Sequence, residues 1–206
     1  MVIIQEIRHE RSSVCIILDT GEQYWIRKTD FHESGFFEQE EYNHDDLLLK
    51  IRVLQYPHAL NHAVAMLAKR PCSKSEIRTR LIQKRFSEDV SDLVVYKLEK
   101  ENLLNDKDFC EQWIQSRLSR RYGPARIRME LKMKGIEENY ITDGLSSLDT
   151  DEALHNACIL AYKYWRRTKP DEDIRKTRQK IITALVRKGY SWDTARTACD
   201  KAEKEI

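Results

Sequence analysis

Glycine, proline and long apolar runs are scarce in this sequence of 206 residues, which contains 6 Gly and 4 Pro. No apolar run approaches the roughly 20 residues that a membrane-spanning helix needs. The first residues, MVIIQEIRHE, also lack the charged-then-apolar layout of a signal peptide. Charged residues make up 34% of the chain and hydrophobic residues 41%. This composition predicts a helical protein with long solvated faces and no membrane contact.

Cysteine pairs are missing as well. The five cysteines (Cys15, Cys72, Cys110, Cys158 and Cys199) stand far apart, and none belongs to a CxxC pair. Isolated cysteines of this kind predict reduced, packed side chains in a cytoplasmic protein.

Motifs for catalysis and metal binding are likewise lacking, since the chain has no P-loop, GxGxxG or GxSxG. His58 and His62 stand four residues apart, but no third ligand or HExxH glutamate accompanies them, so we expect helix-surface histidines. Asp149, Asp151 and Glu152 precede a predicted helix, where capping explains them better than a divalent ion. The sequence therefore predicts a protein that is not an enzyme and has no metal or cofactor.

Charge is distributed unevenly along the chain. Residues 1–58 hold six Lys or Arg against eleven Asp or Glu, which leaves 30 basic against 23 acidic residues in the remainder. Such a basic body favours a polyanion or an acidic protein surface as partner. The common alternative is a solvated helical surface in which acids pair with the bases, and a shortage of acids in the first two repeats weakens that alternative.

Residues 1–58 are predicted to form a β-containing extension followed by a linking helix. VIIQEI, SVCIIL and QYWI read as three short strands, with a hairpin turn at Asp19–Gly21. Residues 30–43 read as a short helix or loop whose aromatic residues anchor the segment. DDLLLKIRVLQY reads as a helix, and Pro57 is expected to begin a new one.

A repeated pattern occupies the rest of the chain. Three similar segments, LIQKRF, LKMKGI and LVRKGY, begin at Leu81, Leu131 and Leu185, and an isoleucine precedes each leucine by four residues. The pattern predicts a mainly α protein with three tandem three-helix repeats in an elongated, curved array. The predicted boundaries are 59–106, 107–150 and 151–206.

Local signals support these helices. Ser73 and Glu76 form a predicted capping box, and Gly123-Pro124 ends one helix and begins the next. In the first repeat, the third helix is expected to bury Val90, Leu93, Val94 and Leu98. In the third repeat, the second helix is longer than its counterparts, and Asp171-Glu172-Asp173 at its start suits the helix dipole.

Basic residues recur on the equivalent first and second helices of the repeats. A stripe of this kind suits phosphate backbones or an acidic groove. We call this predicted partner- or DNA-binding surface the basic face. It comprises Arg70, Lys74, Arg78, Arg80, Lys84, Arg117, Arg120, Arg121, Arg126, Arg128, Lys132, Lys134, Arg166 and Arg167.

Aromatic residues within the repeats have two interpretations. Trp113 follows Phe109 and Cys110 at helical spacing, which predicts a core position. Tyr162, Tyr164 and Trp165 adjoin Arg166 and Arg167, and the sequence leaves open whether they contact a partner or pack between repeats.

The second repeat carries a specific resemblance. Leu104-Asn105-Asp106, Phe109 and Trp113, followed by Gly123-Pro124-x-Arg126-Ile127-x-x-Glu130-Leu131-x-x-Lys134-Gly135-Ile136, resemble the RecX family of bacterial recombinase regulators. Arg70-Pro71-x-Ser73-x-x-Glu76-Ile77 resembles the family's first repeat, and Lys188-Gly189-Tyr190 its third. The likeness covers roughly residues 59–206. Arg85 stands where the first repeat usually has glycine.

The resemblance implies a non-enzymatic protein that binds the RecA filament on single-stranded DNA, and we expect a cytoplasmic monomer. Family members restrain strand exchange, ATP hydrolysis and co-protease activity, and thereby control homologous recombination, DNA repair and the SOS response. The alternative is a sequence-nonspecific DNA-binding module that competes for single strands. A major-groove transcription factor is disfavoured, because tandem repeats do not supply the two-fold symmetry of such dimers.

Overall fold

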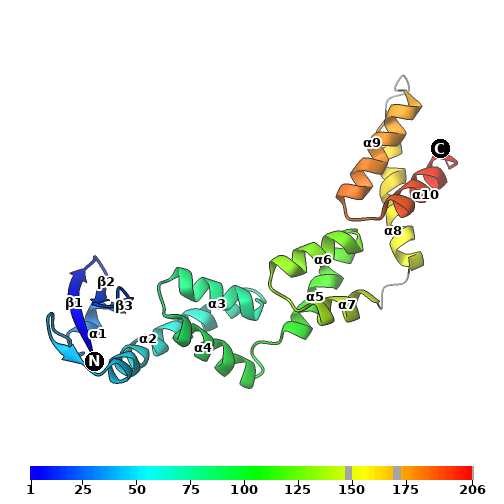
Figure 1. Ribbon diagram of the computed structural model, residues 1–206. Coiled ribbons are helices and arrows are strands. Elements are labelled where there is room, and N and C mark those ends of the chain that lie inside the picture. The colour runs from blue at the N-terminus through cyan, green and yellow to red at the C-terminus, as the bar shows by residue number, and fades with distance from the viewer. Residues whose placement is uncertain (147–149, 169–172, 206) are drawn as a thin grey trace. The chain divides into compact units, whose positions relative to one another are not determined.

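The computed structural model describes residues 1–146, 150–168 and 173–205. It divides into two compact units, Met1–Asn105 and Asp106–Ile206. The first unit contains a small sheet followed by helices, and the described elements of the second are all helical (Figure 1). Within these described residues, no helix is both long and apolar enough to cross a membrane.

The three predicted strands are confirmed as β1 (Val2–His9), β2 (Ser13–Leu18) and β3 (Gln23–Arg27). They pair antiparallel, and Gly21 makes the predicted turn with a φ of 87°. A two-residue strand that the sequence does not predict, β4 (Glu41–Tyr42), pairs with β1, giving the order β3-β2-β1-β4.

The segment between β3 and β4 is anchored by aromatic residues. It begins with a short helix, α1 (Lys28–Phe31), and Phe36 is 3% exposed in the core beneath the sheet. Phe31 and Tyr42 pack against the same core. The anchoring prediction is confirmed for these three residues and wrong for Phe37, which is 60% exposed.

The prediction that Pro57 begins a new helix is wrong. A single helix, α2 (His44–Leu67), runs through Pro57. The proline ring removes the hydrogen bond to the carbonyl of Val53, but Val53 is 63% exposed, so water can satisfy that oxygen. On the opposite face α2 stays buried without interruption. Its Ile51 packs under the sheet, and its Ala59 packs into the first repeat. The boundary predicted at residue 58 therefore lies inside a helix.

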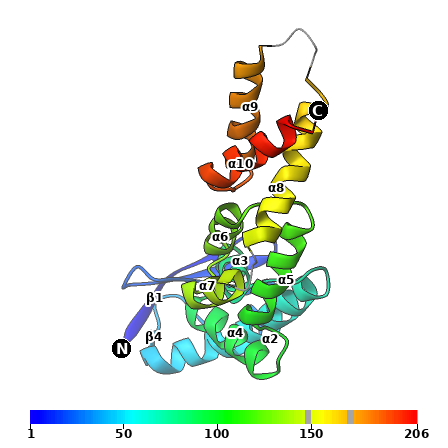
Figure 2. The same cartoon turned by 90° about the vertical axis from the view of Figure 1, so that its right-hand side faces the viewer.

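Three three-helix cores confirm the predicted repeats. The first joins the end of α2 to α3 (Lys74–Gln83) and α4 (Glu88–Lys100). The second comprises α5 (Asp106–Leu118), α6 (Pro124–Met133) and α7 (Glu138–Ser146). The third comprises α8 (Thr150–Trp165), α9 (Ile174–Arg187) and α10 (Trp192–Glu203), which lie side by side in Figures 1 and 2.

The repeated isoleucine and leucine form the centre of each core. The residues concerned are all at most 4% exposed: Ile77, Leu81, Ile127, Leu131, Ile181 and Leu185. As predicted, α9 has 14 residues where α3 and α6 have 10 each. Leu93 is an exception to the predictions, because it is 40% exposed and Ser91 is buried in its place on α4.

The ends of the second helices follow one rule. The residue after each helix cap has a left-handed backbone: φ is 68° at Arg85, 71° at Gly135 and 96° at Gly189. Arg85 tolerates this conformation where the other repeats use glycine, and its guanidinium has local partners. It donates to both carboxylate oxygens of Glu10 at 2.8 Å and lies 5.0 Å from the ring centre of Trp25. Arg85 thus fastens the sheet to the first repeat.

The capping predictions have mixed outcomes. Ser73 and Glu76 form the predicted capping box, and Asp173 caps α9 through the N–H groups of Arg175 and Lys176. Asp151 and Glu152 lie in the first turn of α8, as expected for capping charges. Asp149, Asp171 and Glu172 lie outside the described residues.

Candidate functional site

The basic face is more strongly paired within the molecule than the sequence predicts. Among the residues that the structure describes, seven of its cations form ion pairs, most of them with a carboxylate on a neighbouring helix. They are Arg70 with Glu76, Lys74 with Glu99, Arg78 with Glu88 and Asp92, Arg117 and Arg126 with Glu130, and Arg128 and Lys132 with Glu138. The expectation that acids are too few to pair with the cations of the first two repeats is therefore wrong. Apart from Glu76, each acid is shared by two cations or reaches across from another helix, and only the Arg126–Glu130 pair has a spacing that the sequence reveals.

The other members of the basic face lie differently. Lys134 lies over the ring of Trp113, and Arg80 donates a hydrogen bond to the side chain of Gln83. Within the described parts of the chain, no carboxylate lies within ion-pair distance of five further cations: Lys84, Arg120, Arg121, Arg166 and Arg167. These side chains keep their charge available for an external anion.

Two glycines bring the second and third repeats into backbone contact. A Cβ atom on Gly123 would lie 2.3 Å from the carbonyl carbon of Gly189, and one on Gly189 would lie 2.4 Å from the Cβ of Arg126. The Gly123 N–H donates to Lys188 O at 2.9 Å, and the Ala125 N–H donates to Gly189 O at 3.1 Å. This contact, the glycine junction, joins the Gly-Pro motif of one repeat to the Lys-Gly-Tyr motif of the next.

A buried tyrosine reinforces the glycine junction. The hydroxyl of Tyr190, which is 3% exposed, donates to Arg121 O at 3.1 Å. Burial raises the pKa of Tyr190 to about 12, so the hydroxyl stays protonated as a donor at neutral pH. Backbone and side-chain bonds therefore hold the two repeats in one arrangement.

Cations from both repeats converge beside the glycine junction on the half-buried ring of Tyr122. Lys188 Nζ lies 4.2 Å from the ring centre, and the guanidinium carbons of Arg126 and Arg117 lie 4.6 and 5.9 Å from it. We call these four residues the Tyr122 cluster. Positive charge above an aromatic face is stabilised by the ring quadrupole without being neutralised. The cluster therefore holds cations in fixed positions while leaving them attractive to anions.

One carboxylate balances this cluster. Glu130 accepts from Arg117 Nε at 2.5 Å and from Arg126 Nε at 3.1 Å, and its side chain is 14% exposed. Burial raises the pKa of Glu130, but the bonds from the two arginines outweigh that effect and hold it below its ordinary value. Arg120, Arg121 and Arg187 are exposed around the same junction. Positive charge therefore exceeds negative charge here.

The ring of Trp113 also contacts cations of the basic face. Trp113 packs against the core of its repeat, as predicted, and stacks on Phe109 with ring centres 5.7 Å apart. Arg117 and Lys134 lie over the Trp113 ring at 4.0 and 4.1 Å. The sequence predicts a core position for Trp113 and a place on the basic face for Arg117 and Lys134, whereas the structure brings all three together. The spacing of Trp113 and Arg117 by one helical turn was the signal available.

Replacing Glu130 with glutamine should destabilise the second unit by about 2 kcal/mol, because Arg117, 17% exposed, would keep a buried charge without its carboxylate. Since the folded pKa of Glu130 is lowered, this stabilisation is present above about pH 4.3 and is lost as the pH falls through the folded value. Urea unfolding should show a larger difference between variant and parent at pH 7 than at pH 3. Glu138→Gln, a pair member that is 51% exposed, serves as the control and should change nothing measurable.

The histidines predicted for a helix surface have separate environments. His58 Nε2 lies 2.6 Å from a carboxylate oxygen of Asp30, and His62 lies beside cations of the first repeat. No group of three or more potential metal ligands occurs among the residues that the structure describes.

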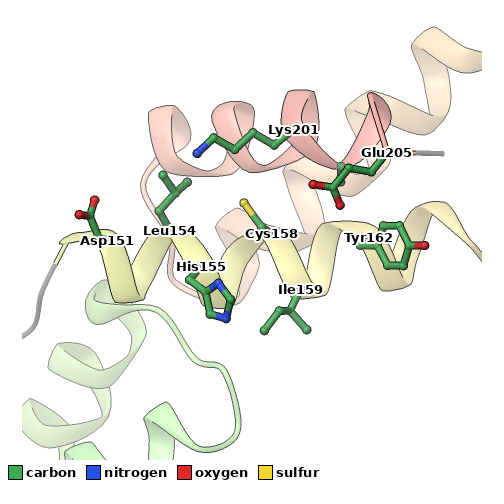
Figure 3. Close-up of a pocket in the computed structure, with 9 residues that line it drawn as sticks. Asp151, Leu154, His155, Cys158, Ile159, Tyr162, Lys201 and Glu205 are labelled. Carbon is green, nitrogen blue, oxygen red and sulfur yellow. The ribbon is translucent and has the colours of Figure 1, made fainter.

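The aromatic residues of α8 are divided between core and surface. Tyr164 and Trp165 pack against the third core, whereas Tyr162 is 37% exposed and lies 5.9 Å from the Arg166 guanidinium. Tyr162 also lines a pocket of about 520 Å³ between α8 and α10, into which Cys158 points (Figure 3). Burial raises the pKa of the Cys158 thiol, so it is protonated at neutral pH and is not an activated nucleophile.

Comparison with known proteins agrees with the repeat architecture. Models of the first, second and third three-helix domains of RecX match residues 59–98, 105–145 and 150–199. The regulatory protein RecX of Mycolicibacterium smegmatis is 31% identical over 142 residues, which cover 66% of this chain and 75% of that protein. The RecX protein of Clostridium perfringens strain SM101 is 34% identical over 134 residues, or 65% of this chain and 63% of the relative.

Solved structures share the fold. A crystal structure of regulatory protein RecX superposes with a TM-score of 0.66 at 22% identity, covering 97% of this chain and 100% of that one. RecX from Lactobacillus salivarius gives 0.65 at 24% identity, covering 73% of this chain and 97% of that one. Three matched domains and relatives named as regulatory proteins show that the chain belongs to the RecX family of regulators.

Proposed function

We propose that this chain binds the RecA filament on single-stranded DNA and inhibits strand exchange, ATP hydrolysis and co-protease activity. It would act in the cytoplasm as a monomer, without cofactor, and restrain recombination, DNA repair and the SOS response. Family membership supports the regulatory role. The observation that carries the mechanism is the Tyr122 cluster, in which cations of two repeats are fixed beside the glycine junction.

Fixed geometry explains how such a surface can bind a filament. Arg126 and Lys188 come from different repeats but share one ring, so little side-chain entropy remains to be lost when they meet an anion. Several repeats on one chain also allow contacts with successive filament subunits, and the later contacts form at high effective concentration. Binding of this kind weakens as salt concentration rises.

ATP hydrolysis by RecA on single-stranded DNA tests the proposal. We expect inhibition when this protein is present at well below one copy per RecA subunit, because a filament-bound regulator affects many neighbours. No inhibition at any ratio would refute the proposed function.

A sequence-nonspecific single-strand-binding module is the second candidate. A partly exposed aromatic ring among cations is typical of proteins that bind single strands, and the half-buried Tyr122 ring with its cations has this character. Such a module must cover the strand to inhibit RecA, so its inhibition should require near-saturating amounts and disappear when excess DNA is added.

A further inference from the structure

A further basic surface lies in the first unit and joins Lys84 of the predicted basic face to cations outside that set. It is a groove of about 820 Å³ between the sheet, the middle of α2 and the turn after α3. Its charged lining residues are all cations: Arg27 and Lys28 on the sheet side, and Lys84 and Arg85 on the repeat side. His58 and His62 of α2 form its floor. Ten of its sixteen lining residues precede the matched family domains, which begin at residue 59.

The acids at the margin of this groove are already occupied. Glu10 accepts both bonds from Arg85, and Asp30 pairs with His58. Arg27, Lys28 and Lys84 are exposed, and no carboxylate of the first unit lies within ion-pair distance of them. The groove therefore carries an excess of positive charge that nothing in the first unit neutralises.

Two further observations indicate an anionic ligand with aromatic parts. The Nε2 atom of His62 is buried and has no hydrogen-bond partner within the described residues, although hydroxyl and amide groups of Ser12, Thr29 and Asn61 line the same groove. Trp25 and Phe86 also line it. Cations interleaved with aromatic rings and hydroxyl groups are the lining of single-strand sites, where phosphates meet the charges and bases meet the rings.

The walls of the groove are held rigidly. Gln55, 2% exposed, donates to Trp25 O at 2.7 Å, and its side-chain oxygen accepts from the N–H of Ser87 at 2.8 Å. Together with the bonds between Arg85 and Glu10, this fixes the sheet against the turn after α3. The spacing of the cations on the two walls is therefore set before a ligand arrives.

We propose that this groove binds the sugar–phosphate backbone of single-stranded DNA, with Arg27 and Lys28 on one wall and Lys84 on the other. The site deepens the proposed function, on which the choice of DNA as the anion rests. The N-terminal extension would then contact the DNA strand directly.

The test measures binding of the full chain to a fluorescein-labelled oligothymidylate by anisotropy, without recombinase. Arg27→Glu with Lys28→Glu should weaken binding about tenfold and reduce the dependence of log affinity on log salt by about 1.4, since each phosphate contact contributes about 0.7. The matched control, Lys50→Glu with Lys100→Glu, makes the same charge change at exposed positions outside the groove lining and should have little effect. Lys84→Gln, on a different element, should reproduce part of the loss if the sheet variant fails to fold.

Equal affinities of the groove variant and the control would overturn the proposal. The proposal would also be overturned if the groove variant lost binding to polyglutamate but kept its binding to DNA. That result would indicate an acidic protein segment as the ligand. RecA ATPase inhibition is measured separately on the same variants. If the groove variant loses DNA binding while the unchanged protein does not inhibit RecA at any ratio, the groove proposal would be supported and the proposed function refuted.

Discussion

Gly123→Ala should destabilise the second unit by about 3 kcal/mol and open the glycine junction. The added methyl group would lie 2.3 Å from both the carbonyl carbon and the oxygen of Gly189, and these are backbone atoms that cannot rotate away. Gly123 has a φ of −80°, which any residue adopts, so the cost arises from the collision alone. Urea unfolding measures the loss. Amide exchange at Ala125, whose N–H donates to Gly189 O, reports whether the junction has opened.

Two other glycines separate collision from backbone strain. Gly35 has a φ of 66° with nothing within 4 Å of an added Cβ, so Gly35→Ala should cost only about 1 kcal/mol of left-handed strain. Gly189→Ala combines a φ of 96° with a Cβ 2.4 Å from that of Arg126, and should cost about 4 kcal/mol. A Gly123→Ala variant no less stable than Gly35→Ala would show that the repeats do not meet at these glycines.

The parts of the fold that depend on local pattern could be read from the sequence. Ile127 and Leu131 lie one helical turn apart, and that spacing alone places both in the core. The Ser73 capping box is equally local. The prediction that Pro57 begins a new helix is wrong because the effect of a proline depends on whether the carbonyl of Val53 reaches water. That exposure follows from how α2 packs and not from the local sequence.

The candidate site depends on contacts between distant residues, and these were not predictable from one sequence. Gly123 reads as a helix stop and Gly189 as a helix end, and each reading is correct locally. Neither reading indicates that the two residues touch. Glu130 similarly reads as a lone acid among bases, although its position between Arg117 and Arg126 makes it the counter-charge of two helices.

Reversing the three exposed arginines around the glycine junction should greatly weaken inhibition of RecA. Within the described residues, Arg120, Arg121 and Arg187 are exposed and form no ion pair, so Arg→Glu changes should leave the helices intact. A charge contact at 4 Å in water contributes about 1 kcal/mol, so losing three should cost about 3 kcal/mol, roughly a hundredfold in the half-inhibitory concentration. Circular dichroism should show unchanged helicity.

A charge-matched variant decides whether inhibition of RecA depends on the location of these charges or only on their sum. Lys163→Glu, Arg196→Glu and Lys204→Glu produce the same net change on exposed surfaces of the third repeat. Long-range attraction to a polyanion would weaken equally in both triple variants, because it depends on the summed field. A defined contact of the arginines around the glycine junction would be lost only in the junction variant, since surface charges beyond about 10 Å are screened at moderate salt. Equal loss in the two variants would thus remove the junction from the filament contact.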